Sequence, residues 1–187
     1  MISPKSWQIS LNRLMSQTGI NSGGRPRIAI IGIGNELRAD DAAGMLVVSR
    51  LLKYGSDFDQ ALIRVIQAGL APENSTSELR AFAPHLVLFV DAADMGEVAG
   101  TIRWIDMEEI SGISASTHSL PLSILAAYLI QEIDCQVALL GIQPASNDVG
   151  GPVSLEVLQA VEEIVNELGT RFSSGEDAAM SLDTFRG

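Results

Sequence analysis

The architecture of this chain can be read from the stretch Arg27-Ile-Ala-Ile-Ile-Gly-Ile-Gly-Asn-Glu-Leu-Arg-Ala-Asp-Asp41. Its apolar run predicts a buried strand over residues 27–33, which ends at a Gly-x-Gly-Asn turn. Helical spacing resumes directly after the acid pair, with Met45, Val48 and Leu51 on one face. The stretch therefore predicts a strand–loop–helix unit whose loop carries two carboxylates. Such a loop would attract a cation and repel an anion.

The two glycines of this turn do not by themselves indicate dinucleotide binding. Leu37 occupies the place of the third glycine in that fingerprint, and Gln67, rather than an acid, ends the second predicted strand. A tight turn and a close approach of the backbone explain Gly32 and Gly34 better.

The chain on either side of this unit alternates between strand and helix patterns. A loop too short for a parallel crossover links the third and fourth strands, so the fourth should run antiparallel at an edge. The order predicts one three-layer α/β domain, in which a mostly parallel five-stranded sheet with one antiparallel edge strand has helices on both faces. Strands are expected at 27–33, 61–67, 86–90, 101–105 and 136–142, and helices at 42–53, 72–82, 120–131 and 153–168.

The two ends of the chain differ from this central region. Residues 1–25 should form a short amphipathic helix, over about 5–16, and a loose linker. This helix would pack on the edge of the domain or dock a partner. The domain itself should span residues 26–169, and the polar residues 170–187 read as a disordered tail. Residues 106–117 show no regular pattern.

Composition restricts the classes of partner. With 187 residues and 47% hydrophobic residues the chain can bury a core, and its net charge of −11 argues against nucleic acid or an anionic membrane. No apolar run is long enough for a membrane helix and no signal peptide is apparent, which favours a cytoplasmic protein. The single cysteine, Cys135, excludes an internal disulfide and is expected to be a small buried residue.

Acids at the carboxyl ends of predicted strands are the candidates for chemistry. Asp40 and Asp41 follow the first strand and Asp91 follows the third. In open α/β sheets, functional groups collect beyond these strand ends. Each acid could instead cap a helix or loop, although one cap does not need two adjacent carboxylates. We expect Asp40 to serve local structure and Asp41 to belong to the site.

The two histidines occupy contrasting positions. His118 lies in a Ser-Thr-His-Ser loop before a helix start marked by Pro121, whereas His85 begins the third strand at the opposite edge. A lone histidine is more often structural, but His118 could join the two strand-end acids. Two carboxylates and an imidazole suit divalent first-row metals such as Ni, Zn, Mn or Fe. No Gly-x-Ser-x-Gly elbow and no His-Glu-x-x-His motif is present.

The chain closely resembles the [NiFe]-hydrogenase maturation endopeptidases, particularly those of the formate-hydrogenlyase hydrogenase 3 type. Five of its motifs match that family and occur in the family's order. The resemblance covers roughly residues 27–168. One departure is Ala42, where this family usually has glycine after the acid pair; alanine is tolerated if the backbone there is helical. The matching motifs are Gly32-Ile-Gly-Asn-Glu-Leu-Arg-Ala-Asp-Asp41, Gly69-Leu-Ala-Pro-Glu-Asn74, Val90-Asp-Ala-Ala-Asp-Met-Gly96, Ser116-Thr-His-Ser-Leu-Pro-Leu122 and Leu140-Gly-Ile-Gln-Pro144.

The resemblance implies an endopeptidase that removes the C-terminal extension of a hydrogenase large-subunit precursor after nickel insertion. It places the family's metal-contacting and catalytic residues on Asp41, Asp91 and His118. The nickel would be brought by the substrate, although other divalent metals could occupy the site. The expected protein is a monomer. Two alternatives stay open: a non-catalytic chaperone that holds the nickel-loaded large subunit, and a small-ligand-binding α/β domain.

Overall fold

A central twisted sheet organises the molecule. The computed structural model describes residues 5–22, 25–54, 57–106, 114–115 and 121–173. Five strands lie in the order β2-β1-β3-β6-β4; β2, β1, β3 and β6 are parallel and β4 is the antiparallel edge strand. This confirms the predicted fold class. The bounds are β1 Ile28–Ile33, β2 Ile63–Gly69, β3 Leu86–Asp94, β4 Ile102–Asp106 and β6 Gln136–Ile142.

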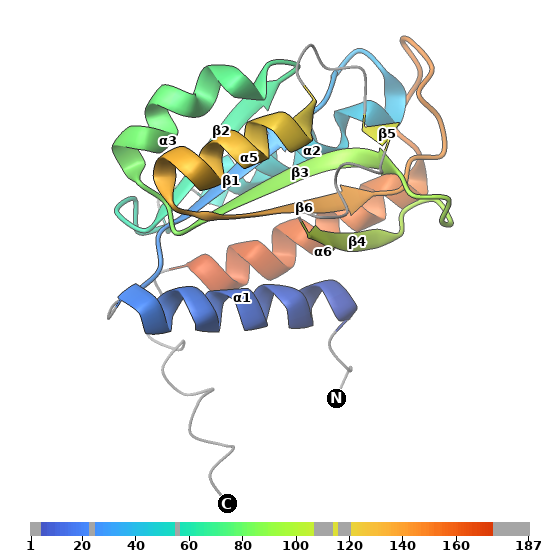
Figure 1. Cartoon of the computed structure of the whole chain (residues 1–187). Helices are drawn as coiled ribbons and strands as arrows, with labels where there is room; N and C mark the ends of the chain where they lie inside the picture. Colours follow the sequence, from blue (N-terminus) through green and yellow to red (C-terminus); the bar gives the residue numbers. More distant parts are fainter. Residues whose placement is uncertain (1–4, 23–24, 55–56, 107–113, 116–120, 174–187) are drawn as a thin grey trace, which may run out of the picture.

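Helices cover both faces of the sheet (Figure 1). Helices α2 and α6 pack on one face, with α1 beside α6, while α3 and α5 lie on the other. Short 3-10 helices precede α2 and α3, and one follows α2. The bounds are α1 Ser6–Ser22, η1 Ala39–Ala42, α2 Ala43–Leu51, η2 Leu52–Tyr54, η3 Pro72–Ser75, α3 Thr76–Phe82, α5 Leu122–Ile133 and α6 Leu155–Phe172.

The strands divide their side chains between two cores because successive residues point to opposite faces. In β3, Leu88 and Val90 join the core under α2 and α6, whereas Val87 and Phe89 join the core under α3 and α5. Asp91 follows Val90 in the strand, so by the same alternation its side chain is on the α3–α5 face. Parallel strands buried on both faces read as unbroken apolar runs, as these do.

Several predicted boundaries are wrong. Helix α1 continues to Ser22 and α6 to Phe172, so residues 170–172 belong to the last helix and not to the tail. Strand β3 continues to Asp94 because Ala93 and Asp94 pair with the two-residue strand β5, Ser114–Ala115. The expectation that residues 106–117 are irregular is therefore wrong at β5. Most of the predicted tail lies outside the described residues.

Helix α1 is part of the core rather than a loose appendage. Trp7 and Leu11 are fully buried in the core formed with α6. The Trp7 indole N–H donates to Glu163 at 3.2 Å, and Gln8 donates to Glu167 at 2.9 Å. This packing supports the first of the two readings of the N-terminal helix. No helix in the described ranges has both the length and the apolarity to cross a bilayer.

Candidate functional site

The turn after β1 fixes Asp41 in place. Gly34 has a φ of +136°, and a Cβ there would lie 1.9 Å from the Asp41 carbonyl oxygen, so only glycine fits. The next amide, Asn35 N–H, donates to both the Asp41 carbonyl at 3.1 Å and its carboxylate Oδ2 at 3.0 Å. Asp41 is 5% exposed. The turn therefore holds this carboxylate just below the surface.

The start of α2 is pressed directly onto the ends of two strands. A Cβ on Gly44 would lie 2.1 Å from the Val90 carbonyl oxygen of β3 and 2.3 Å from the Ile33 carbonyl oxygen of β1. Gly32 allows the same approach from the β1 side, since its Cβ would lie 2.4 Å from the Gly44 carbonyl. This close contact brings the acid pair of η1 to β3, whose next residue after Val90 is Asp91.

Asp91 is a fully buried carboxylate on the central strand. Asp91 pairs with Gly141 of β6 on one side. The residue before it, Val90, pairs with Gly32 near the end of β1. The sequence predicted that Asp91 comes just after the third strand. In the structure β3 continues to Asp94, so Asp91 lies within the strand. The structure nevertheless brings Asp41 and Asp91 to the same edge of the sheet, where η1 contacts β3.

Asp40 has a different role from its neighbour. Its fully buried carboxylate accepts hydrogen bonds from Ala145 N at 2.7 Å, Ser146 N at 2.9 Å and Ser154 N at 2.6 Å, and from the Ser154 hydroxyl at 3.0 Å. Burial acts to raise the pKa of Asp40, but these hydrogen bonds outweigh it and the pKa lies below the ordinary value. Asp40 clamps the loop between β6 and α6, which confirms the predicted structural role.

Ala42 departs from the glycine expected by resemblance without disturbing this geometry. Its φ of −73° and ψ of −8° lie in the right-handed helical region, which alanine adopts freely. The condition for tolerating alanine is met. The residue of η1 in the left-handed region is instead Ala39, with a φ of +36°.

Gln143 is an organising residue that sequence reasoning missed. Its buried side chain accepts from Met95 N at 2.7 Å and Glu97 N at 3.2 Å, and donates to Asp94 at 3.2 Å. It thereby ties the turn after β3 to the end of β6. The signal was present in the Leu-Gly-Ile-Gln-Pro motif, where a polar residue follows a buried strand.

The other titratable candidates are two histidines and one cysteine. His118 lies outside the described residues, and within the described ranges no three potential ligands cluster. His85 lies at the amino edge of the sheet, where its Nδ1 accepts from Arg27 N at 2.8 Å; partial burial and the Arg27 charge lower its pKa. Burial raises the pKa of the Cys135 thiol to about 11, which makes it a poor nucleophile.

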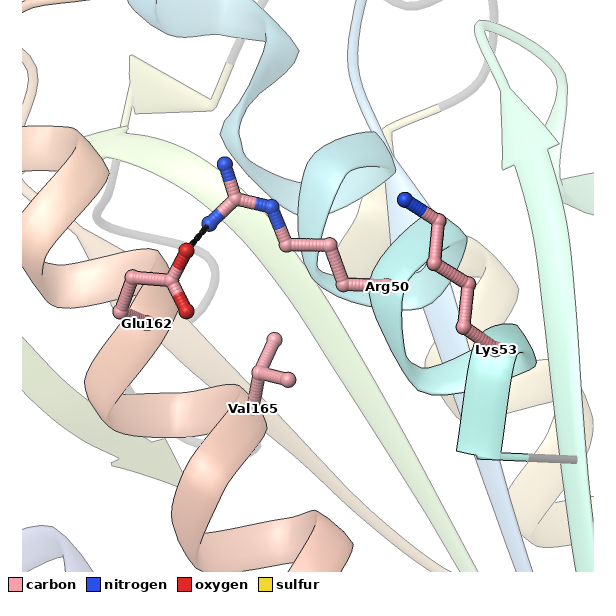
Figure 2. Close-up of a pocket in the computed structure, with 4 residues that line it drawn as sticks. All are labelled: Arg50, Lys53, Glu162 and Val165. Carbon is pink, nitrogen blue, oxygen red and sulfur yellow. Dashed lines mark hydrogen bonds and ion pairs between the residues drawn. The ribbon is translucent and has the colours of Figure 1, made fainter.

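A hollow of about 350 Å³ lies elsewhere, between α2 and α6 (Figure 2). Arg50, Lys53, Glu162 and Val165 line it, and the Arg50 guanidinium pairs with Glu162. Arg50 belongs to the last turn of α2, whereas Asp41 precedes the first turn. The hollow is thus at the other end of the helix from the acids.

Comparison with known proteins gives a consistent result. The family profile described as hydrogenase maturation protease matches residues 45–170. The hydrogenase 3 maturation protease of Escherichia coli K12 is 32% identical over 155 residues, spanning 82% of this chain and 96% of that protein. A Methanocaldococcus jannaschii protein provisionally named a hydrogenase maturation protease is 38% identical over 146 residues, spanning 76% of this chain and 86% of that protein.

A solved structure shares the fold. The crystal structure of a [NiFe] hydrogenase maturation protease from Thermococcus kodakarensis KOD1 superposes with a TM-score of 0.70 at 32% identity. The match covers 83% of this chain and 97% of that one.

Proposed function

Since this chain belongs to the hydrogenase maturation protease family and is an endopeptidase, we propose that it removes the C-terminal extension of a [NiFe]-hydrogenase large-subunit precursor after nickel insertion. The observation that carries the proposal is the packing of Gly44 onto Ile33 and Val90, because it gathers two buried carboxylates at one sheet edge. Nickel belongs to the substrate in this scheme and serves as the element that is recognised.

The donors fit such a metal. Asp41 and Asp91 supply carboxylate oxygens, and His118 is the proposed nitrogen donor. Strand β5 supports the assignment of His118, because it brings the chain back to β3 shortly before that residue. Ala115 of β5 pairs with Ala93, which lies two residues beyond Asp91. His118 follows Ala115 by three residues in the sequence.

Peptide cleavage needs a polarised carbonyl or an activated water. The two carboxylates could hold a metal that polarises the carbonyl, or one of them could activate the water. The Asn35 amide holds Asp41 Oδ2, and no donor in the described part of the chain binds Oδ1. Oδ1 is therefore the oxygen that would meet a metal or take a proton from water. A bound metal would supply Lewis acidity. If the metal does not take part in the cleavage step, a carboxylate would act as general base. Both routes use the same residues.

The site assignment is tested with matched substitutions. Asp91→Asn keeps the size and removes the charge, and His118→Ala removes the proposed nitrogen ligand. Each should slow cleavage of the nickel-loaded precursor by roughly a hundredfold or more. His85→Ala is the control, because that histidine lies at the opposite edge. Thermal unfolding should show that all three variants are folded. Full cleavage by His118→Ala would remove this residue from the site.

A further inference from the structure

Four large apolar side chains are exposed at the carboxyl edge of the sheet, where Asp41 and Asp91 also lie. Leu37 is 74% exposed, Val98 79%, Val149 76% and Leu155 66%. The first three lie in the loops after β1, β3 and β6, and Leu155 is the first residue of α6. Figure 1 shows the loops after β1, β3 and β6 gathered at this end of the molecule. We call these four residues the apolar rim. Large exposed apolar side chains grouped around a site mark an interaction surface more often than scattered ones do.

The backbone holds the rim in position. Arg38 and Val149 form an antiparallel bridge, and Gly150 N donates to the Leu37 carbonyl at 2.8 Å, so Leu37 and Val149 stand on adjacent segments. Asp40 binds Ser154 N, the residue before Leu155. A Cβ on Gly100 would lie 2.5 Å from the Glu156 carbonyl, which seats the Val98 turn against the start of α6. The exposure is thus built into the fold.

The charged residues around the apolar rim indicate which kind of protein surface it would bind. The three segments 34–42, 94–100 and 145–156 contain one basic residue, Arg38, whose Nη2 donates to the Asn147 carbonyl at 3.2 Å. Their exposed acids are Glu36, Asp94, Glu97, Asp148 and Glu156. An apolar surface with an acidic border is complementary to an apolar patch bordered by Lys and Arg.

We propose that the apolar rim is the docking surface for the folded body of the large-subunit precursor, through an apolar patch of that protein bordered by basic residues. The inference rests on the proposed function and adds the surface that selects the substrate. Leu37 of the rim lies four residues before Asp41, in the segment between β1 and α2, so a protein whose terminal segment reaches the acids would lie beside the rim.

Affinity for the precursor tests the proposal without requiring cleavage. The nickel-loaded precursor is immobilised, and the full chain carrying Asp91→Asn is passed over it by surface plasmon resonance. Adding L37S and V149S should raise Kd by about tenfold or more. The control pair I9S and L52S removes two exposed apolar side chains from α1 and η2 and should change Kd by less than about twofold. Higher salt should slow association, since the acidic border is exposed.

Each outcome has a distinct meaning. Equal Kd values for the rim pair, the control pair and the parent would overturn the docking surface, even if the wild-type protein cleaves. Rim-dependent binding by a protein whose wild-type form never cleaves would support docking and refute the proposed proteolysis. A wild-type dimer in sedimentation that L37S/V149S dissociates would assign the rim to a second copy and overturn the precursor as its occupant.

Discussion

Asp40 and Asp41 are neighbours in sequence with different surroundings. Asp40 accepts four hydrogen bonds from the loop before α6, whereas the Asp41 carboxylate is held by the Asn35 amide at the edge of the sheet. The clamp and the proposed catalytic acid therefore share one turn. The sequence could not assign the clamp's partners, because they lie more than 100 residues away.

Asp40 should make stability depend on acid pH. The pKa of Asp40 is lower in the folded chain than the unfolded value of 3.8, so its contribution is complete above 3.8 and is lost as pH falls through the folded pKa. Asp40→Asn should lower the free energy of unfolding by about 2 kcal/mol at neutral pH, and by less under acid conditions. Urea unfolding at pH 7 and pH 3 measures both values.

Asp148→Asn is the control for this prediction, because Asp148 is an exposed acid of the same loop. It should change stability by less than about 0.5 kcal/mol at either pH. An Asp40→Asn loss that stays constant across the pH range would contradict the role of the charged carboxylate.

Among the contacts between helices and strands, the junction of η1 and α2 with β1 and β3 positions the two acids. Gly44→Ala would normally favour a helix, but here its Cβ meets two strand carbonyls at 2.1 and 2.3 Å. We expect a loss of about 3 kcal/mol, or a displaced helix start with impaired cleavage. Gly151→Ala is the control, since its Cβ would have no contact closer than 3.3 Å. Equal stability and activity of the two variants would show that the junction yields easily.

The elements themselves were predictable from the sequence, and their ends were less so. Apolar runs predicted all five strands of the main sheet, and the short loop before Thr101 predicted that β4 is antiparallel. The continuation of β3 to Asp94 depends on pairing with β5, a two-residue strand with no pattern of its own. The carboxylates at positions 40, 41 and 91 were recognisable from their place after apolar runs. Gln143 could be noticed only as a polar residue after a buried strand, and its partners could not be assigned, because they lie in a turn 46 to 48 residues away.

Helix α1 extends the core beyond the region that the family profile matches, residues 45–170. Its fully buried Trp7 packs against the core beneath α6 and β4. Because α1 lies along these elements rather than at the acid-bearing edge, its contribution should be to stability and not to chemistry.

Trp7→Ala separates these two contributions. The cavity left by the indole should cost about 3–5 kcal/mol in the free energy of unfolding. Cleavage measured at low temperature, where the variant is still folded, should stay close to that of the wild type. Ile9→Ala, on the exposed side of the same helix, should cost less than about 0.5 kcal/mol. A large loss of cleavage by folded Trp7→Ala would place α1 in the substrate-binding surface.

We propose that this endopeptidase cleaves a large-subunit precursor only after nickel has been inserted. The most direct measurement is the mass of the nickel-loaded precursor before and after incubation with the protein, beside a nickel-free control. We predict the loss of a C-terminal peptide from the loaded sample alone. Cleavage of both samples would contradict nickel recognition, and a stable complex with intact mass in both would indicate a chaperone instead of a protease.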